Sequence, residues 1–340
     1  MQKKYFRWSL FLAGLIILLI ASVFLSLSVG EMNLGFMNIF SILSKGNESM
    51  EYTILSQIRI PRVLLGIAVG GSLSLAGILL QGIYRNPLVE PYTMGISGGA
   101  SLGVAFAIVF SLHQILGSFV LPLAGFIGSF LIIFLVYTIS TRSGRINIQT
   151  MLLTGVMISF IASSSMMFLM AITSSENLYG IIFWIMGSLD EPDISLIYIT
   201  LITAIASLFA SYLFVQPLNA LRLGEEKAKH LGINTDVAIK LLFLLASLLA
   251  GVCVAVAGVI GFVGLIIPHL MRLLVGSDFR ILLVSSFLSG SIFLVLSDVI
   301  ARTIISPNEL PIGVITGIVG GIVFLLMMSR SSLRDLRNNR

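Results

Sequence analysis

Few residues of this sequence could do chemistry in water, and the only densely polar segment in the middle of the chain is PLNALRLGEEKAKHLGIN at 217–234. Long apolar runs flank this stretch on both sides, so a polar group of this size must lie in water. A solvated connector between two helices is the simpler interpretation, and a recognition element is the other. Six charged or titratable side chains fall within nine positions: Arg222, Glu225, Glu226, Lys227, Lys229 and His230.

The same stretch has a helical period, because side chains three and four positions apart share one face of a helix. Gly224 and Gly232 divide it into two short pieces, which predicts a helix–turn–helix on one membrane surface. We expect its recurring apolar residues to form a face that is presented to a partner. The residues that carry this period are Leu221, Glu225, Ala228 and Leu231.

The sequence lacks the motifs for nucleotide binding, zinc catalysis and cysteine chemistry. The phosphate-binding pattern G-x-x-x-x-G-K-[ST] and the zinc pattern H-E-x-x-H do not occur, and His113, His230 and His269 are far apart in the sequence. The single cysteine, Cys253, lies in an apolar run, which excludes a disulfide framework and a cysteine metal site. We therefore expect no catalytic residue, no metal ligand and no cofactor bound by this chain.

Composition places these residues in a membrane. Of 340 residues, 57% are hydrophobic and 10% are charged, and the mean hydropathy is +1.07. Soluble domains carry roughly 25% charged residues, so this chain must be an integral membrane protein. The net charge of +5 is dispersed between apolar segments, so it does not indicate nucleic-acid binding.

Ten apolar segments predict an all-α polytopic fold with about ten transmembrane helices. A helix needs about 20 residues to cross the hydrocarbon, so the eighth segment, which is short and contains Pro268, should be a broken helix. Dense small residues in the second segment should let neighbouring helices approach closely. The segments are 8–29, 61–83, 93–111, 117–139, 149–172, 194–215, 238–257, 259–272, 281–303 and 311–328.

Basic residues predict the orientation of these helices. One set of loops holds most of the lysines and arginines, including those of 217–234 and of both ends of the chain. The positive-inside rule places that set, and both termini, in the cytoplasm, with the chain crossing its membrane several times. The opposite set of loops holds only Lys45, Arg59, Arg62 and Arg302.

Charge within the predicted helices is almost absent. Asp298 and Arg302 are four positions apart near the outer end of the ninth segment. Ion-coupled carriers usually keep polar sites near the midplane, so the pattern favours a passive conduit that receives energy at 217–234. A secondary transporter driven by an ion gradient and a membrane enzyme acting on lipid are the rival classes.

Four motifs occur in order along the chain. They are RIPR to RNPLVEPYTMGISGGA across 59–100, WIMGSL at 184–189, LNALRLGEEKAKHLGIN at 218–234, and AGVIGFVGLIIPHLMR at 257–272, which is followed by ELPIG at 309–313. Together they closely resemble the permease subunits of ABC importers for iron chelates and vitamin B12, the FecCD-type permeases. The resemblance covers nearly the whole chain, and it implies the plasma or inner membrane of a prokaryotic cell.

The resemblance implies a single permease domain over 1–340 with the type II ABC importer fold of vitamin B12 permeases. It implies a second permease, which is the same chain or a paralogue, two ATPase subunits that hold ATP and Mg, and an external substrate-binding protein. A ferric siderophore is the expected cargo, with haem or cobalamin as alternatives. The stretch 217–234 becomes a pair of coupling helices whose ATPase contacts are Leu221, Gly224, Glu225, Ala228, Leu231 and Gly232.

Three arginines are candidates for docking the binding protein. Arg59 and Arg62 are three apart at the outer start of the second segment, and Arg302 lies at the outer end of the ninth. Guanidinium groups pair bidentately with carboxylates, and the resemblance implies that these positions receive acidic residues from the two lobes of the partner. A local pair between Asp298 and Arg302, or extension of the side chains to the interface, is the simpler explanation.

Candidate residues for the translocation path are small or soft. Met166 and Met170 are four apart on one face of the fifth segment, and thioether side chains adapt to varied surfaces. Gly317 and Gly320 in the last segment could make room for a cargo. Ordinary packing explains each of these four residues equally simply.

Overall fold

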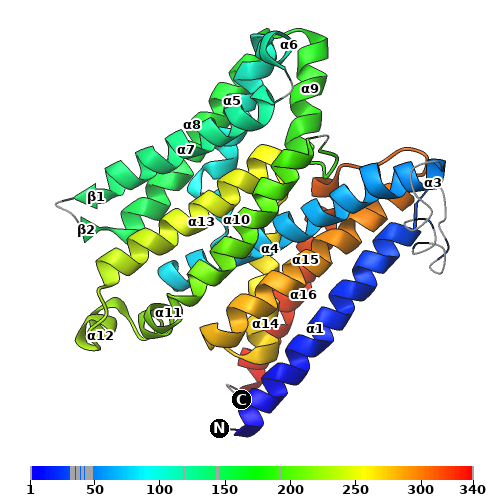
Figure 1. Cartoon of the computed structure of the whole chain (residues 1–340). Helices are drawn as coiled ribbons and strands as arrows, with labels where there is room; N and C mark the ends of the chain where they lie inside the picture. The colour runs from blue at the N-terminus through cyan, green and yellow to red at the C-terminus, as the bar shows by residue number, and fades with distance from the viewer. Residues whose placement is uncertain are drawn as a thin grey trace.

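The computed structural model describes residues 2–30, 35, 39, 42, 49–117, 119–142, 145–191 and 193–338. This part of the chain is almost entirely helical (Figure 1). The elements are α1 (Gln2–Ser28), α3 (Met50–Thr53), η1 (Ile54–Arg59), α4 (Ile60–Tyr84), η2 (Pro91–Met94), α5 (Ile96–Val109), α6 (Leu112–Leu116), α7 (Val120–Ser140), β1 (Thr141–Arg142), β2 (Arg145–Ile146), α8 (Ile148–Ile172), α9 (Ser175–Met186), α10 (Ile194–Tyr212), α11 (Val215–Leu221), α12 (Glu225–His230), α13 (Thr235–Ala257), α14 (Val263–Val275), α15 (Phe279–Thr303) and α16 (Ile312–Asn338).

The ten predicted membrane segments are confirmed as helices. Seven helices of the described chain are long and apolar enough to cross a membrane, and three shorter apolar helices, Ile96–Val109, Val263–Val275 and Ile312–Met327, match the remaining segments. The second segment begins earlier than expected, because Met50–Tyr84 is one continuous helix with a π-helical stretch, η1, before α4. The two strands β1 and β2 form only a short antiparallel hairpin between α7 and α8.

Helix α4 is the centre of the molecule, and α10, α13, α14 and α15 pack around it. Small residues permit this packing, as the sequence predicted. A Cβ atom at Gly70 would lie 2.3 Å from the carbonyl oxygen of Gly290 in α15, and one at Gly77 would lie 1.9 Å from that of Gly264 in α14. The backbones therefore touch at these two crossings, which only glycine allows.

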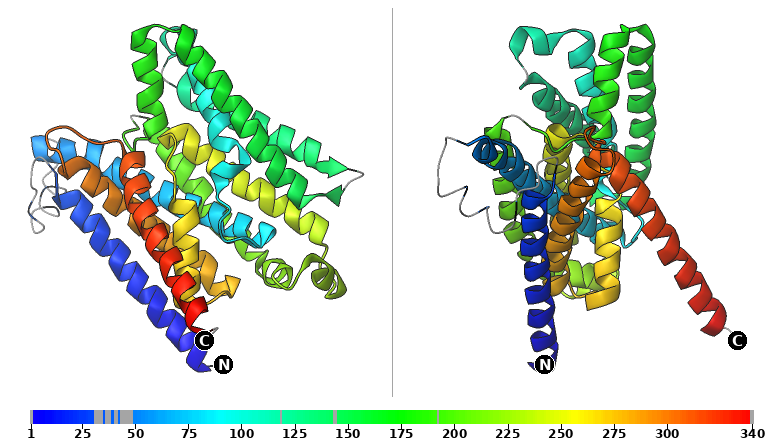
Figure 2. Two further views of the ribbon diagram at one scale, coloured as in Figure 1. Left: turned by 180° about the vertical axis from the view of Figure 1, so that it is seen from behind. Right: turned by 90° about the vertical axis from the view of Figure 1, so that its right-hand side faces the viewer.

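The remaining helices lie on two sides of this centre. Helices α5, α7 and α8 form a second group, while α1 packs against α15 (Figure 1). The far half of α16 diverges from the other helices (Figure 2). We call the end of the bundle that carries the N-terminus, α11 and α12 the lower end, and the end that carries α3 and α6 the upper end, as they lie in Figure 1.

Breaks in the helices follow from proline and left-handed residues. Helix α4 stops at Tyr84 because Arg85 adopts φ +51°, and Pro87 cannot continue the helix. Helix α14 begins only after Phe262, a bulky residue with φ +69°, and contains Pro268. With 13 residues it is too short to cross a membrane, so the predicted broken eighth helix is confirmed.

Candidate functional site

The helix–turn–helix predicted at 217–234 is present at the lower end as α11 and α12 (Figure 1). It begins slightly earlier than expected, at Val215. Gly224 caps α12 with φ +110° and Gly232 follows α12 with φ +81°. Both are backbone conformations that glycine adopts without strain, which explains why glycine stands at these two turns.

The direction of the apolar face differs from the prediction. Leu221 and Ala228 were expected on the presented surface, but they are 2% and 0% exposed and belong to the main hydrophobic core. The apolar face of the pair packs inward, toward α4 and α13, because periodicity defines a face but not the side on which its partner lies. The leucines that project outward are Leu223, 58% exposed, and Leu231, 63% exposed, beside the open backbone of Gly232.

Glu225 holds α12 against the start of α13. Its carboxylate lies 2.9 Å from Nζ of Lys229, and the Thr235 hydroxyl donates to it at 3.4 Å. Lys229 also lies 3.9 Å from the carboxylate of Asp236 in α13. Glu225 is therefore partly engaged within the chain, and its expected contact with an ATPase remains a prediction.

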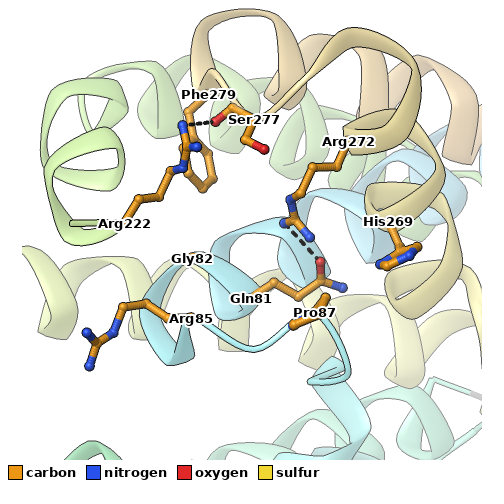
Figure 3. Close-up of a pocket in the computed structure, with 9 residues that line it drawn as sticks. All are labelled: Gln81, Gly82, Arg85, Pro87, Arg222, His269, Arg272, Ser277 and Phe279. Atoms are coloured by element: carbon orange, nitrogen blue, oxygen red, sulfur yellow. Dashed lines mark hydrogen bonds between the residues drawn. The ribbon is translucent and has the colours of Figure 1, made fainter. Parts of the chain in front are cut away.

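Polar contacts that the sequence did not reveal tie α11 to the turn between α14 and α15. The Asn219 amide donates to Asp278 at 3.4 Å and accepts from the backbone N–H of Phe279 at 3.3 Å. Arg222 donates to the carbonyl oxygen of Ser277 at 2.6 Å (Figure 3). Movement of the helical pair would thus be passed directly to α14 and α15.

The turn between α14 and α15 is itself fixed by Asp278. Although burial acts to raise its pKa, hydrogen bonds from the Arg280 backbone, Lys4 and Asn219 hold the pKa of this carboxyl below its usual range. Nζ of Lys4 lies 3.1 Å from the carboxylate. The start of α1 and the α11–α12 pair therefore share one anchor.

Gln81 continues these connections into the central helix. Its amide nitrogen donates to the carbonyl oxygens of Gly264 and Leu265 in α14, at 3.2 and 3.3 Å, and its amide oxygen accepts from Arg272 at 3.2 Å (Figure 3). One group of polar contacts thus joins α11 to the α14–α15 turn, and a second group joins α14 to α4.

The three arginines predicted to dock the binding protein are buried at the upper end rather than free on the surface. Arg59, Arg62 and Arg302 are 5%, 8% and 8% exposed. Asp298, 2% exposed, accepts from Nε of Arg62 at 2.9 Å and from Nε of Arg302 at 2.8 Å. The local pair between Asp298 and Arg302 is therefore present and has a third member from a distant helix.

The outer contacts of this network involve other elements. Arg62 also pairs with Glu309 at 2.7 Å, and the Glu309 side chain is 48% exposed. Arg59 donates to the carbonyl oxygen of Leu27, and Arg302 donates to the backbone and hydroxyl oxygens of Ser26, so both arginines fasten the end of α1. A partner carboxylate would reach Arg62 only by displacing Glu309, and docking here remains a prediction.

The four candidates for the translocation path have different surroundings. Met166 and Met170 are half-buried against the cluster around Ile108 and Ile181, so packing accounts for them. Gly320 is buried, and a Cβ atom there would lie 2.6 Å from that of Phe262. At Gly317 an added Cβ would meet nothing within 4 Å, which makes it the candidate that faces open space.

Glu90 is a residue that the sequence analysis passed over. It lies between α4 and η2, where burial raises the pKa of its carboxyl while a hydrogen bond from the Phe262 backbone N–H opposes that rise. Tyr92, two residues later, accepts a hydrogen bond from the N–H of Ile260 at 3.2 Å. Together these contacts hold the loop that precedes the broken helix α14.

Comparisons with known proteins agree with this architecture. The hemin transport system permease protein HmuU of Yersinia pestis is 37% identical over 94% of this chain and 96% of its own length. The vitamin B12 import system permease protein BtuC of Klebsiella pneumoniae is 36% identical over 97% of this chain and 96% of its own.

A solved structure has the same fold. It shows a proposed metal-chelate type ABC transporter in an inward-facing conformation, is 31% identical, and superposes with a TM-score of 0.83 over 94% of this chain and 99% of its own. The predicted type II importer permease fold is thereby confirmed. The model of the FecCD transport family matches residues 18–330. With that match over most of its length, the chain belongs to the FecCD transport family.

Proposed function

We propose that this chain is the permease subunit of a binding-protein-dependent ABC importer that carries an iron chelate into the cytoplasm. Family membership and the two permease relatives support the transporter class. A ferric siderophore is our first candidate for the cargo. Haem and cobalamin are the alternatives, since the relatives are named for hemin and vitamin B12 and the solved relative for a metal chelate.

The distribution of charge supports a conduit driven from outside the chain. Among the described residues the ion pairs that involve helices α4 and α15 lie at helix ends, as Arg62 with Asp298 does at the upper end. Ion-coupled carriers need ionisable or unwound polar groups near the midplane. The energy then comes from ATP and Mg bound by a separate ATPase subunit, two copies of which serve two permeases.

The observation that carries the proposal is the projecting α11–α12 pair. Leu223 and Leu231 are exposed on it, whereas Leu221 and Ala228 fix it to the core and Glu225 braces it against α13. Such a rigid, anchored projection suits insertion into a cleft of an ATPase. Its contacts through Asn219 and Arg222 provide the route by which closure of the ATPase reaches α14 and α15.

The two ends of the molecule then have different partners. The lower end, with both termini, lies in the cytoplasm against the ATPase subunits. The upper end receives the substrate-binding protein. One of its carboxylates replaces Glu309 as the partner of Arg62, and others pair with the neighbouring Arg59 and Arg302. Contacts of this kind steer association and fix orientation more than they add affinity.

Reconstitution tests the coupling role. In proteoliposomes that contain the ATPase and binding protein, the double variant Leu223→Glu/Leu231→Glu should lose ATPase association and uptake. The matched control, Leu213→Glu, changes a leucine that is 80% exposed just before α11 and should retain both. Equal transport by wild type and the double variant would show that α11 and α12 are only a solvated connector.

Two further measurements separate the rival functions. Competition among labelled ferric siderophore, hemin and cobalamin in the same vesicles identifies the cargo. A secondary transporter would show uptake without the ATPase that collapses with an uncoupler, whereas the proposed importer requires ATP and tolerates loss of the ion gradient.

A further inference from the structure

A cavity of about 290 Å³ opens at the lower end, between the end of α4, the end of α11, and α14 with the turn that follows it. Most of its exposed wall is apolar, and Figure 3 shows polar side chains from these separate elements around one space. The lining residues are Gln81, Gly82, Arg85, Pro87, Arg222, His269, Arg272, Ser277 and Phe279.

Three of these side chains are guanidinium groups, and within the described chain none of the three forms an ion pair with a carboxylate. Arg272 donates to Gln81, and Arg222 donates to the Ser277 carbonyl. Each guanidinium carries five N–H groups, so both retain donors for a further acceptor. Arg85 is exposed and points away from the other two, so it lies at the rim (Figure 3).

Two carboxylates at the same end, those of Asp278 and Glu225, are engaged by other groups. Asp278 is adjacent in sequence to the lining residue Ser277, but its carboxylate is engaged by Lys4 and Asn219. Glu225 pairs with Lys229. These two carboxylates are thus committed to other groups, and among the described residues no ion pair neutralises Arg222 or Arg272.

His269 supplies a second, independent observation. It lines the cavity, and its Nδ1 atom is buried without a hydrogen-bond partner among the described residues. A buried polar atom without a partner is unfavourable, and such atoms usually mark the position of water, an ion or a ligand. Imidazole can donate to an anion from this nitrogen.

From this arrangement we propose that the cavity is an anion site that binds a phosphate group through Arg222, Arg272 and His269. A phosphate presents several acceptor oxygens, which match guanidinium forks from two sides. The cavity is lined by residues at the end of the candidate span Met50–Tyr84, and the ends of spanning helices lie at the depth of phospholipid headgroups. The phosphate group belongs to an anionic phospholipid or to a soluble phosphate. This proposal does not depend on the identity of the cargo or on binding of an ATPase.

Native mass spectrometry of the full chain in detergent tests the proposal with two probes, phosphatidylglycerol and inorganic phosphate, and with phosphatidylcholine as the zwitterionic comparison. The Arg222→Gln/Arg272→Gln variant should bind the preferred probe about tenfold more weakly. The control Arg280→Gln removes an exposed arginine that follows the lining residue Phe279 and does not line the cavity, so it should bind as the wild type does.

Arg272 also donates a hydrogen bond to Gln81, so its loss could unfold the double variant. The single variant Arg222→Gln is therefore measured in parallel and replaces the double variant if the latter does not fold. Preference for phosphatidylglycerol over phosphatidylcholine, lost in the variants, assigns the site to a lipid headgroup. Binding of inorganic phosphate with the same variant pattern, and without that lipid preference, assigns it to soluble phosphate. Equal binding by wild type and variants overturns the proposal.

Absence of saturable binding for either probe also overturns it. If Arg222→Gln then weakens ATPase association, the cavity accepts a protein carboxylate instead.

Discussion

At the scale of single residues, Asp298 is the acceptor shared by Arg62 and Arg302. We expect Asp298→Ala to destabilise the protein by roughly 3–5 kcal/mol, because it leaves two buried guanidinium groups without their counter-charge. Thermal unfolding in detergent measures the effect. Glu309→Gln alters the exposed member of the same network and should cost far less. Similar losses for both substitutions would show that the buried carboxylate has no special role.

Glu90 should make stability depend on pH. Its folded-state pKa is raised by burial, so the folded protein holds this proton more tightly than the unfolded chain does. Stability should therefore rise as the pH falls through the folded pKa, and level off below the unfolded pKa of about 4.3.

Substitution isolates the contribution of Glu90. Glu90→Gln, a neutral analogue of the protonated acid, should be more stable than wild type at neutral pH. Its stability should change less than that of wild type across the pH range between the unfolded and the folded pKa of Glu90. Unfolding temperatures measured across that range test this. If the stability of Glu90→Gln depends on pH as that of wild type does, Glu90 is not the source of the pH dependence.

At the scale of helices, the contacts of α4 depend on backbone approach. Gly77→Ala should destabilise by roughly 1–3 kcal/mol or more, since the added Cβ would lie 1.9 Å from a backbone oxygen of α14 that cannot move without its helix. Gly14→Ala in α1 is the matched control, because an added Cβ there meets nothing within 4 Å. The measurement is the unfolding temperature of both variants, and equal values would contradict close packing at this crossing.

At the scale of the whole molecule, the orientation in the membrane can be tested through exposed positions at the two ends. Glu226 on α12 and Asp190 after α9 are both exposed, and the natural Cys253 is buried. In cells or right-side-out vesicles, a membrane-impermeant maleimide should label Asp190→Cys at once and Glu226→Cys only after permeabilisation. Labelling in the reverse order would invert the proposed topology.

The sequence alone determined the fold class and the ten membrane helices. Hydrophobic length is a local property, and 20 apolar residues in lipid have few alternatives to a helix. Glycine and proline likewise predicted the break at Pro268 and the two pieces at 217–234. Helix α9 was missed because its 12 residues are too few for a search tuned to membrane-crossing length.

Only the tertiary structure decided which side chains meet. Periodicity placed Leu221 and Ala228 on one face, but whether that face turns inward depended on α4 and α13, which pack beneath it. Asp298 accepts from Arg62 across 236 positions, and Arg272 meets Gln81 across 191. Such pairings depend on how helices cross, and the crossings are set by backbone contacts between distant glycines such as Gly77 and Gly264, which no local pattern encodes.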